Sequence, residues 1–154
     1  MPELKTQSIR MPDYTPNPDS VAGIQQIVRA IYAGGVPRKT LDLVHMRASQ
    51  INGCNGCIAY GMQNAAAAGI STEQLLSLPA WRESALFSDS ERAALAMTEA
   101  MTRLADHPDS VSDEIWAGAA EHFDNTALVA LASMAALTNF FNRVNTTLRV
   151  QVTF

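Results

Sequence analysis

Residues 42–57 read DLVHMRASQINGCNGC, and they span the junction of two predicted helices. The first ten of these residues belong to a pattern of helical period that starts at Arg38 and predicts a helix over residues 38–51. The apolar residues on one side of this helix are Leu41, Val44, Ala48 and Ile51. Gly53 follows its end, where glycine readily takes the left-handed conformation that terminates helices. Another helix is predicted to open near Cys54 and to run to Ala68.

Helical patterns also cover the chain on both sides of this stretch. One helix is predicted from Ser20 to Gly34, and four shorter or longer ones after Gly69, the last of which runs to about Leu148. The residues predicted to cap these helices are Asp19 or Ser20, Ser71, Ser88, Ser112, and Asp124 or Asn125. The helix after Ser88 is predicted to bury Leu95, Met97, Met101 and Leu104. Only residues 148–154 alternate like a strand or an extended tail, so the predicted fold class is all-α.

Length, charge and hydropathy limit the range of functions. The 154 residues make about one domain, with an extended N-terminal arm at residues 1–18, which four prolines interrupt, and a helical domain at residues 19–154. The net charge is −4 and the basic residues are scattered, so we expect no nucleic acid partner. The longest apolar run, residues 127–137, is shorter than the about 20 residues that cross a bilayer, so we expect no membrane span. The arm lacks the apolar run of a secretory signal, and we therefore expect a cytoplasmic protein.

Cys54 and Cys57 carry the chemistry that the sequence predicts. A thiol attacks as its thiolate, and the positive end of a helix stabilises that form. A spacing of three residues on a helical turn brings two sulfur atoms close enough to bond. The alternative is a passive pair, either a structural disulfide or two buried thiols. A disulfide that closes a loop of only four residues stabilises a fold by about 2 kcal/mol, which is little for a structural disulfide.

The other candidate residues read as structural. No metal site or cofactor is predicted, because zinc needs about four ligands and neither a second cysteine pair nor a paired histidine spacing is present. The three histidines are His45, His107 and His122. Four aromatic residues are expected to be core or subunit contacts: Trp81, Trp116, Phe140 and Phe141. For Arg47, an ion pair and a role in lowering a thiol pKa both stay open.

Several motifs together resemble the alkylhydroperoxidase AhpD/carboxymuconolactone decarboxylase family. They are Ser49-Gln-Ile-Asn-Gly-Cys54-x-x-Cys57 with an acid twelve residues before Cys54, the stretches 78–84 and 87–95, and the ending Asn142-Arg-Val-Asn145. The resemblance covers about residues 20–150. It implies an AhpD-like helical bundle that assembles as a homo-oligomer, a trimer or a hexamer. It also implies that a hydroperoxide substrate is reduced by a cysteine pair, which a dithiol reductant, protein or small molecule, then re-reduces.

The resemblance assigns roles to individual residues. Cys57 resembles the family's peroxidatic cysteine, and Cys54 its resolving cysteine, which faces the reductant. Asp42 stands at the position of a glutamate that relays protons to the peroxidatic thiol. The relay histidine of the family stands four residues after the second cysteine, where this chain has Gly61. His45 shares a helix face with Asp42 and is a candidate substitute base.

The departure at Gly61 leaves two functions open. The leading hypothesis is a peroxidase-like thiol oxidoreductase with a cycle of dithiol and disulfide. The alternative is a redox-responsive switch or an oligomeric scaffold with little turnover. Lactone decarboxylation, the family's other activity, is disfavoured because the decarboxylases do not rely on a cysteine pair. If the scaffold is otherwise competent, Gly61→His is expected to raise the peroxidase rate.

Overall fold

The computed structural model describes residues 8–11 and 15–150. Throughout these residues the regular structure is helical, which confirms the predicted all-α class. The helices are α1 (Pro18–Tyr32), α2 (Arg38–Asn52), α3 (Asn55–Ala65), α4 (Thr72–Ser77), α5 (Asp89–Thr102), α6 (Asp113–Ala120) and α7 (Asn125–Leu148). Two turns of 3-10 helix, η1 (Ala66–Ala68) and η2 (Leu78–Ala80), follow α3 and α4.

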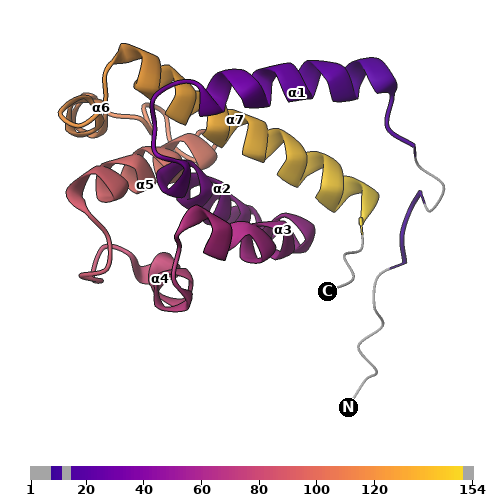
Figure 1. The fold of residues 1–154 in the computed structure, drawn as a ribbon, viewed down its shortest axis with the longest axis horizontal. Helices are drawn as coiled ribbons and strands as arrows, with labels where there is room; N and C mark the ends of the chain where they lie inside the picture. Colours follow the sequence, from indigo (N-terminus) through magenta and orange to yellow (C-terminus); the bar gives the residue numbers. More distant parts are fainter. Residues whose placement is uncertain (1–7, 12–14, 151–154) are drawn as a thin grey trace.

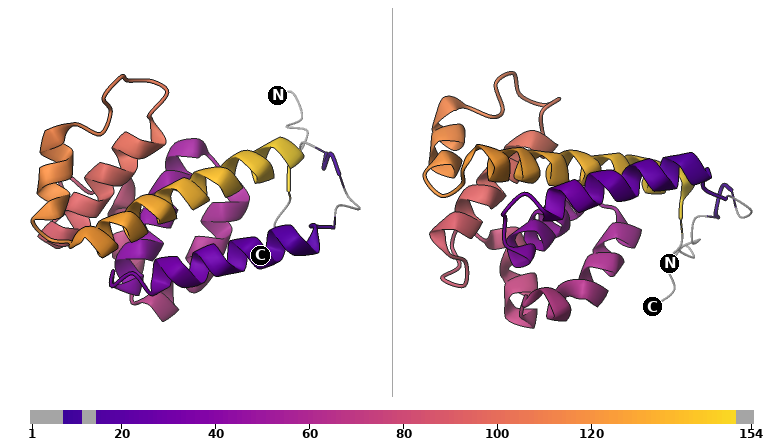
Figure 2. Two further views of the ribbon diagram at one scale, coloured as in Figure 1. Left: turned by 90° about the horizontal axis from the view of Figure 1, so that it is seen from above. Right: turned by 45° about the horizontal axis from the view of Figure 1, so that its top comes forward.

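The bundle is built around α2, which packs against α3, α5 and α7 (Figure 1). α1 packs against α7, and the two helices diverge toward the N-terminal end of α1 and the C-terminal end of α7 (Figure 2). One apolar core joins α1, α2, α5, α6 and α7, around Ile31, Leu41 and Leu131. A second joins α2, α5 and the segment between α3 and α5, around Leu43, Met46 and Leu78. Both cores hold α2 in place, so the residues on its remaining side have fixed positions.

The predicted helix ends are largely confirmed. Ser71 and Ser88 form capping boxes, and Ser112 and Asp124 cap α6 and α7. Asn17 is the cap of α1 in place of Asp19 or Ser20, since its side chain accepts the N–H groups of both and Pro18 occupies the first helical position.

The structure differs from the sequence prediction at the end of α5 and extends α7 to Leu148. Leu104 is not buried as predicted, because α5 ends at Thr102 and the side chain of Leu104 is 64 % exposed. Leu148 belongs to α7, and residues 151–154 of the predicted tail lie outside the described residues, as do residues 1–7 and 12–14 of the predicted arm. In the described part of the predicted arm, residues 8–11 and 15–17 contain no helix, whereas Pro18 already belongs to α1.

α7 is long and apolar enough to cross a bilayer by length and composition alone. In the fold it lies against α1, α2, α3, α5 and α6, and it buries Leu128, Leu131 and Met134 in the first core. Its second half changes character and carries Asn139, Asn142 and Asn145 at intervals of three residues. These amides lie on one side of α7 and meet the junction of α2 and α3.

Candidate active site

The junction between α2 and α3 places the two cysteines. Gly53 ends α2 with φ = 65°, a left-handed conformation that side chains other than glycine disfavour. Cys54 then takes an extended conformation and becomes the N-cap of α3. Cys54 and Cys57 are joined as a disulfide, with Cα atoms 5.4 Å apart. The predicted proximity of the two sulfur atoms is therefore found at the N-terminus of a helix.

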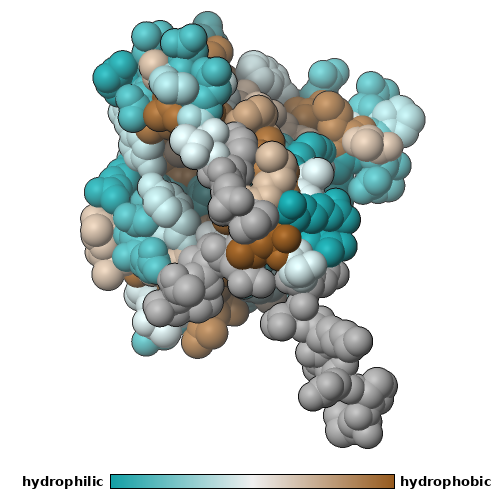
Figure 3. Space-filling model, turned by 90° about the vertical axis from the view of Figure 1, so that its right-hand side faces the viewer, coloured by the Kyte–Doolittle hydropathy of each residue, from teal (hydrophilic) through white to brown (hydrophobic). Residues whose placement is uncertain are grey.

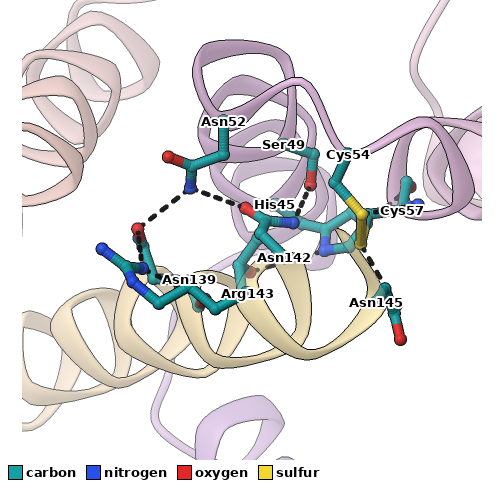
Figure 4. Close-up of a disulfide and its surroundings, with 10 residues drawn as sticks. His45, Ser49, Asn52, Cys54, Cys57, Asn139, Asn142, Arg143 and Asn145 are labelled. Carbon is teal, nitrogen blue, oxygen red and sulfur yellow. Dashed lines mark hydrogen bonds between the residues drawn. A yellow bond between two sulfur atoms is a disulfide. The ribbon is translucent and has the colours of Figure 1, made fainter. Parts of the chain in front are cut away.

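Each sulfur atom has its own hydrogen-bond donor (Figure 4). The backbone N–H of Cys57 donates to Cys54 Sγ at 3.4 Å. The side-chain amide of Asn145, from α7, donates to Cys57 Sγ at 3.5 Å. Both cysteines are buried, with 2 % and 4 % of their surface exposed. Donors to sulfur favour the charged thiolate, whereas burial opposes it.

The two cysteines line different cavities. Cys57 borders a cavity of about 420 Å³ between α1, α2, α3 and α7. Cys54 borders a hollow of about 200 Å³ at the end of α7, together with Gly53, Thr146 and Arg149. Asn145 borders both. The face of the molecule that carries this end of α7 has hydrophobic residues gathered near its centre, among polar ones (Figure 3).

Asp42 faces the larger cavity together with residues that the sequence analysis did not single out. Tyr32, at the end of α1, donates its hydroxyl to Asp42 Oδ1 at 2.8 Å. Arg38 Nε lies 3.5 Å from Asp42 Oδ2. Burial raises the pKa of the Tyr32 phenol, and the hydrogen bond to Asp42 raises it further. The carboxylate is thus held between a protonated phenol and a guanidinium beside the cavity.

His45 also borders the cavity, but its ring nitrogens are engaged elsewhere. Its Nε2 donates to the carbonyl oxygen of Cys57 at 3.0 Å, because a carbonyl can only accept. Its Nδ1 then accepts from the hydroxyl of Thr138 at 3.4 Å. Burial lowers the pKa of His45, which favours the neutral imidazole that this pattern requires. In this arrangement His45 holds the backbone of Cys57 and does not contact its sulfur.

Gly61 lines the cavity at the position where the relay histidine was expected. A Cβ atom at this position would overlap Sδ of Met46, and it would lie 2.9 Å from Cγ of Met46 and 3.3 Å from Cδ2 of His45. Met46 is 2 % exposed and belongs to the second core. The side chain of Met46 therefore occupies the space that any side chain at residue 61 would need.

A network of amides fixes α7 against α2 beside the disulfide (Figure 4). Asn52 donates to the Oδ1 atoms of Asn139 and Asn142 at 3.0 and 2.8 Å. Asn142 donates to Ser49 Oγ at 3.1 Å, and both residues are fully buried. Since Asn145 is one turn further along α7, this network also sets the position of the amide that reaches Cys57.

Arg47 belongs to a separate ionic cluster around Glu99 of α5, which resolves the choice left open for it. Arg47 Nε and Arg82 Nη1 lie 2.7 and 2.6 Å from the carboxylate, and Trp81 Nε1 donates to it at 3.0 Å. Burial by itself raises the pKa of Glu99. The hydrogen bonds from Trp81, Arg82 and Arg47 outweigh that effect, so the pKa of this carboxyl lies below its usual value. The cluster ties α2 and α5 to the segment between α4 and α5.

The sequence of this chain matches a known protein family. A sequence model of the carboxymuconolactone decarboxylase family matches residues 18–100, more than half of the chain. The chain belongs to this family. The matched range includes Tyr32, Asp42 and both cysteines, and it ends before α7. Among the residues that the structure describes, no group of three or more His, Cys, Asp and Glu side chains is arranged to hold a metal ion.

Two bacterial proteins match more than two thirds of this chain. The uncharacterized protein YdfG of Bacillus subtilis is 28 % identical over 138 residues, which are 90 % of this chain and 92 % of YdfG. The uncharacterized protein YnjA of Escherichia coli is 34 % identical over 109 residues, which are 71 % of this chain and 58 % of YnjA. The match to YnjA thus leaves over a third of that protein uncovered.

Several solved structures share the fold of this chain. ATU0492 of Agrobacterium tumefaciens, a protein of unknown function grouped with the antioxidant defence protein AhpD, has a TM-score of 0.84 at 23 % identity, over 96 % of this chain and 99 % of that one. The debrominase Bmp8 has a TM-score of 0.77 at 23 % identity, over 89 % of this chain and 73 % of Bmp8. A cysteine-to-alanine variant of Bmp8, in complex with 2,3,4-tribromopyrrole, matches equally well. At these identities the likeness establishes the fold.

The structure thus brings all four predicted site residues to one place, and it adds three. Cys57, Asp42 and His45 border the larger cavity, and Cys54 is bonded to Cys57 from the neighbouring hollow. The sequence analysis did not single out Tyr32 and Arg38, and it quoted Asn145 within a motif without giving it a role. Phe141, read as a core or subunit contact, also lines the cavity. The signals in the sequence for this part of α7 are the ending Asn142-Arg-Val-Asn145 and the spacing of its three asparagines.

Proposed function

We propose that the protein is a thiol oxidoreductase that reduces hydroperoxides through a dithiol–disulfide cycle of Cys57 and Cys54. The observation that carries the proposal is a bonded cysteine pair at a helix N-terminus whose second member opens on a cavity that also holds a carboxylate. A volume of about 420 Å³ is sufficient for a small organic molecule. Membership of a family that includes enzymes is consistent with catalysis in this cavity.

The proposed cycle has three steps. The Cys57 thiolate attacks the terminal oxygen of the hydroperoxide, the O–O bond breaks, and the leaving alkoxide takes a proton to become the alcohol. The Cys54 sulfur then attacks the Cys57 sulfenic acid, which forms the disulfide and releases water. An external dithiol, protein or small molecule, reopens the disulfide by thiol–disulfide exchange and is itself oxidised.

We assign proton transfer to Asp42, acting through water in the cavity, and the positioning of Asp42 to Tyr32 and Arg38. The role of His45 as a base stays a prediction. Its hydrogen bonds to Cys57 and Thr138 support a positioning role, because neither ring nitrogen is directed at the thiol. Asp42→Asn is expected to slow peroxide consumption about 100-fold, the usual size of a lost acid–base group.

The alternative function is a redox-responsive switch, and the backbone geometry supports turnover instead. The Cα separation of 5.4 Å lies within the range that disulfides take and is also normal for residues three apart on a helix. Reduction of the disulfide therefore requires little movement of α3, whereas a switch needs a second arrangement of the chain. A cycle between two states of one backbone is suited to repeated catalysis.

Peroxide consumption with an excess of a dithiol donor tests the proposal. Turnover by the wild-type chain that is lost in both Cys54→Ser and Cys57→Ser supports it. Thr98→Ala provides a control, because it removes a buried hydroxyl that donates within α5 and borders neither cavity of the cysteines. Reversible disulfide formation without turnover would instead establish the switch. The assay is run with hydrogen peroxide and with an aromatic organic hydroperoxide, since the cavity is lined by Tyr32, Tyr60 and Phe141.

We further propose that the protein works as a homo-oligomer in the cytoplasm, a trimer or a hexamer. The exposed large apolar side chains of α1 and α7 support self-association. They are Val21, Ile27, Tyr32, Val129 and Phe140. Light scattering of the purified protein at several concentrations measures the assembly, and a mass equal to that of one chain would reject it.

A further inference from the structure

The hydrogen bonds at the disulfide pose a question about which sulfur ionises. The first turn of α3 presents a backbone N–H to Cys54, the N-cap, and not to Cys57. In helices that start with a cysteine pair, this donor and the helix dipole favour the thiolate of the first cysteine. The proposed function requires the second cysteine to attack. A feature outside α3 must therefore stabilise the Cys57 thiolate.

The charged and titratable groups near Cys57 do not account for stabilisation of its thiolate. Those that border its cavity are Tyr32 from α1, Arg38, Asp42 and His45 from α2, and Tyr60 from α3, while Arg149 borders the hollow beside Cys54. The Asp42 carboxylate opposes a second negative charge, and Arg38 is already paired with it. His45 is neutral, and its proton points at the carbonyl of Cys57.

Asn145 is positioned to stabilise the Cys57 thiolate. Its amide lies 3.5 Å from Cys57 Sγ, and it borders both cavities, so that it stands between the two sites from which the disulfide can be reached. The adjoining turns of α7 are fixed to α2 by the hydrogen bonds of Asn142 to Ser49 and Asn52. A donor held in place before the charge forms stabilises that charge more than mobile water does.

We propose that Asn145 is a catalytic residue whose side-chain amide stabilises the Cys57 thiolate and thereby determines that Cys57 ionises. The inference rests on the proposed thiol chemistry of this site. In the dithiol form it makes Cys57 the nucleophile toward the substrate. In the disulfide form it makes Cys57 the better leaving group, because exchange is faster when the departing thiol has the lower pKa.

The reductive half of the cycle then has a defined direction. The thiolate of the reductant attacks Cys54 Sγ, a bond forms between these two sulfur atoms, and the bond between Cys54 and Cys57 breaks. The electron pair stays on Cys57, beside the amide of Asn145. The second thiol of the reductant then displaces Cys54, which leaves with a proton, and the reductant departs as a disulfide. Asn145 thus directs the reductant to the hollow beside Cys54.

Thiol titration in the absence of peroxide tests the inference. In a Cys54→Ser background, where serine serves as the helix cap, thiolate absorbance and alkylation rate are followed against pH. Asn145→Ala is expected to raise the pKa of Cys57 by about one unit, which is about tenfold less thiolate at a fixed pH below that pKa. Asn145→Asp, which is isosteric, is expected to raise it more because a carboxylate replaces a donor. In a Cys57→Ser background the pKa of Cys54 should move by less than about a third of these shifts.

The control is Asn64→Ala in α3, which removes an amide that borders the same cavity and donates to the carbonyl oxygen of Tyr60 and not to sulfur. This variant is expected to leave the pKa of Cys57 unchanged even if it lowers stability. Equal shifts at both cysteines, no shift in either Asn145 variant, or a matching shift in the control would overturn the inference. Because the titration uses no substrate, a wild-type chain without peroxidase turnover would reject the proposed function and leave this result standing.

Discussion

The pair of Gly61 and Met46 leads to a prediction about stability that can be worked from the structure. Gly61→Ala in the middle of a helix gains about 1 kcal/mol of helix propensity. The same change brings Cβ onto the side chain of Met46, and overpacking of a core costs about 1–3 kcal/mol. Met46 is enclosed by the second core and has little room to move, so the larger values apply. We expect a net loss of about 1–2 kcal/mol.

A double-mutant cycle isolates the contact. Met46→Ala alone leaves a cavity and is expected to cost about 2–5 kcal/mol. In Gly61→Ala/Met46→Ala the new methyl group enters vacated space, so the clash disappears and the gain in helix propensity remains. The double variant should therefore be about 2 kcal/mol more stable than the sum of the single changes. Urea unfolding of the four proteins measures this coupling.

The same cycle with histidine links stability to activity. Gly61→His alone is expected to destabilise the protein, and for that reason its peroxidase rate is a poor test of the missing relay. Gly61→His/Met46→Ala gives the imidazole room beside Cys57, and a gain of about tenfold in peroxide consumption is expected, below the full 10²–10⁴ of a well-placed base. Additive effects on stability in both cycles would refute the reasoning, since Met46 would then not be what excludes a side chain at residue 61.

Other predictions follow from single residues. Glu99→Gln should lower the free energy of unfolding by about 2–3 kcal/mol, because Arg47 is left as a buried charge, whereas Glu83→Gln at an exposed site should change it by less than about 0.5 kcal/mol. As the pKa of Glu99 is lowered in the fold, its stabilisation is present at neutral pH and is lost as the pH falls below 4.5, which acid unfolding of the wild type and of Glu99→Gln can compare. The pKa of His45 is also lowered, so the unfolded chain takes up the proton first and stability falls as the pH drops below 6.5; this slope should be absent in His45→Gln. Tyr32→Phe should slow peroxide consumption while leaving the thiol pKa of Cys57 unchanged, and an unchanged rate would remove Tyr32 from the site.

Features of the fold that depend on neighbouring residues could be predicted from the sequence. Helix caps are of this kind, because a serine side chain and the N–H three residues later meet within one turn, as at Ser71 and Ser88. The left-handed glycines that end helices are another, as at Gly53 and Gly69. The cap of α1 was misplaced because Asp19 and Ser20 are themselves good caps, and only the geometry shows that Asn17 accepts their N–H groups.

The roles of the site residues depend on hydrogen-bond partners that are distant in sequence, so these roles could not be predicted from the sequence. The spacing of Asp42, His45 and Ser49 places them on one face of α2. Their partners come from Tyr32 of α1, the carbonyl of Cys57 and Asn142 of α7, and no local pattern reveals these.

The contact between Gly61 and Met46 is another feature that no local sequence pattern predicts. Read singly, one is a glycine within a helix and the other an apolar residue on a buried face. Packed together, they show that the space of the absent histidine is filled by a side chain fifteen residues earlier. Restoring an imidazole to this scaffold therefore requires changes at two positions. In the function that we propose, Asp42 and Asn145 support the chemistry of Cys57 in its absence.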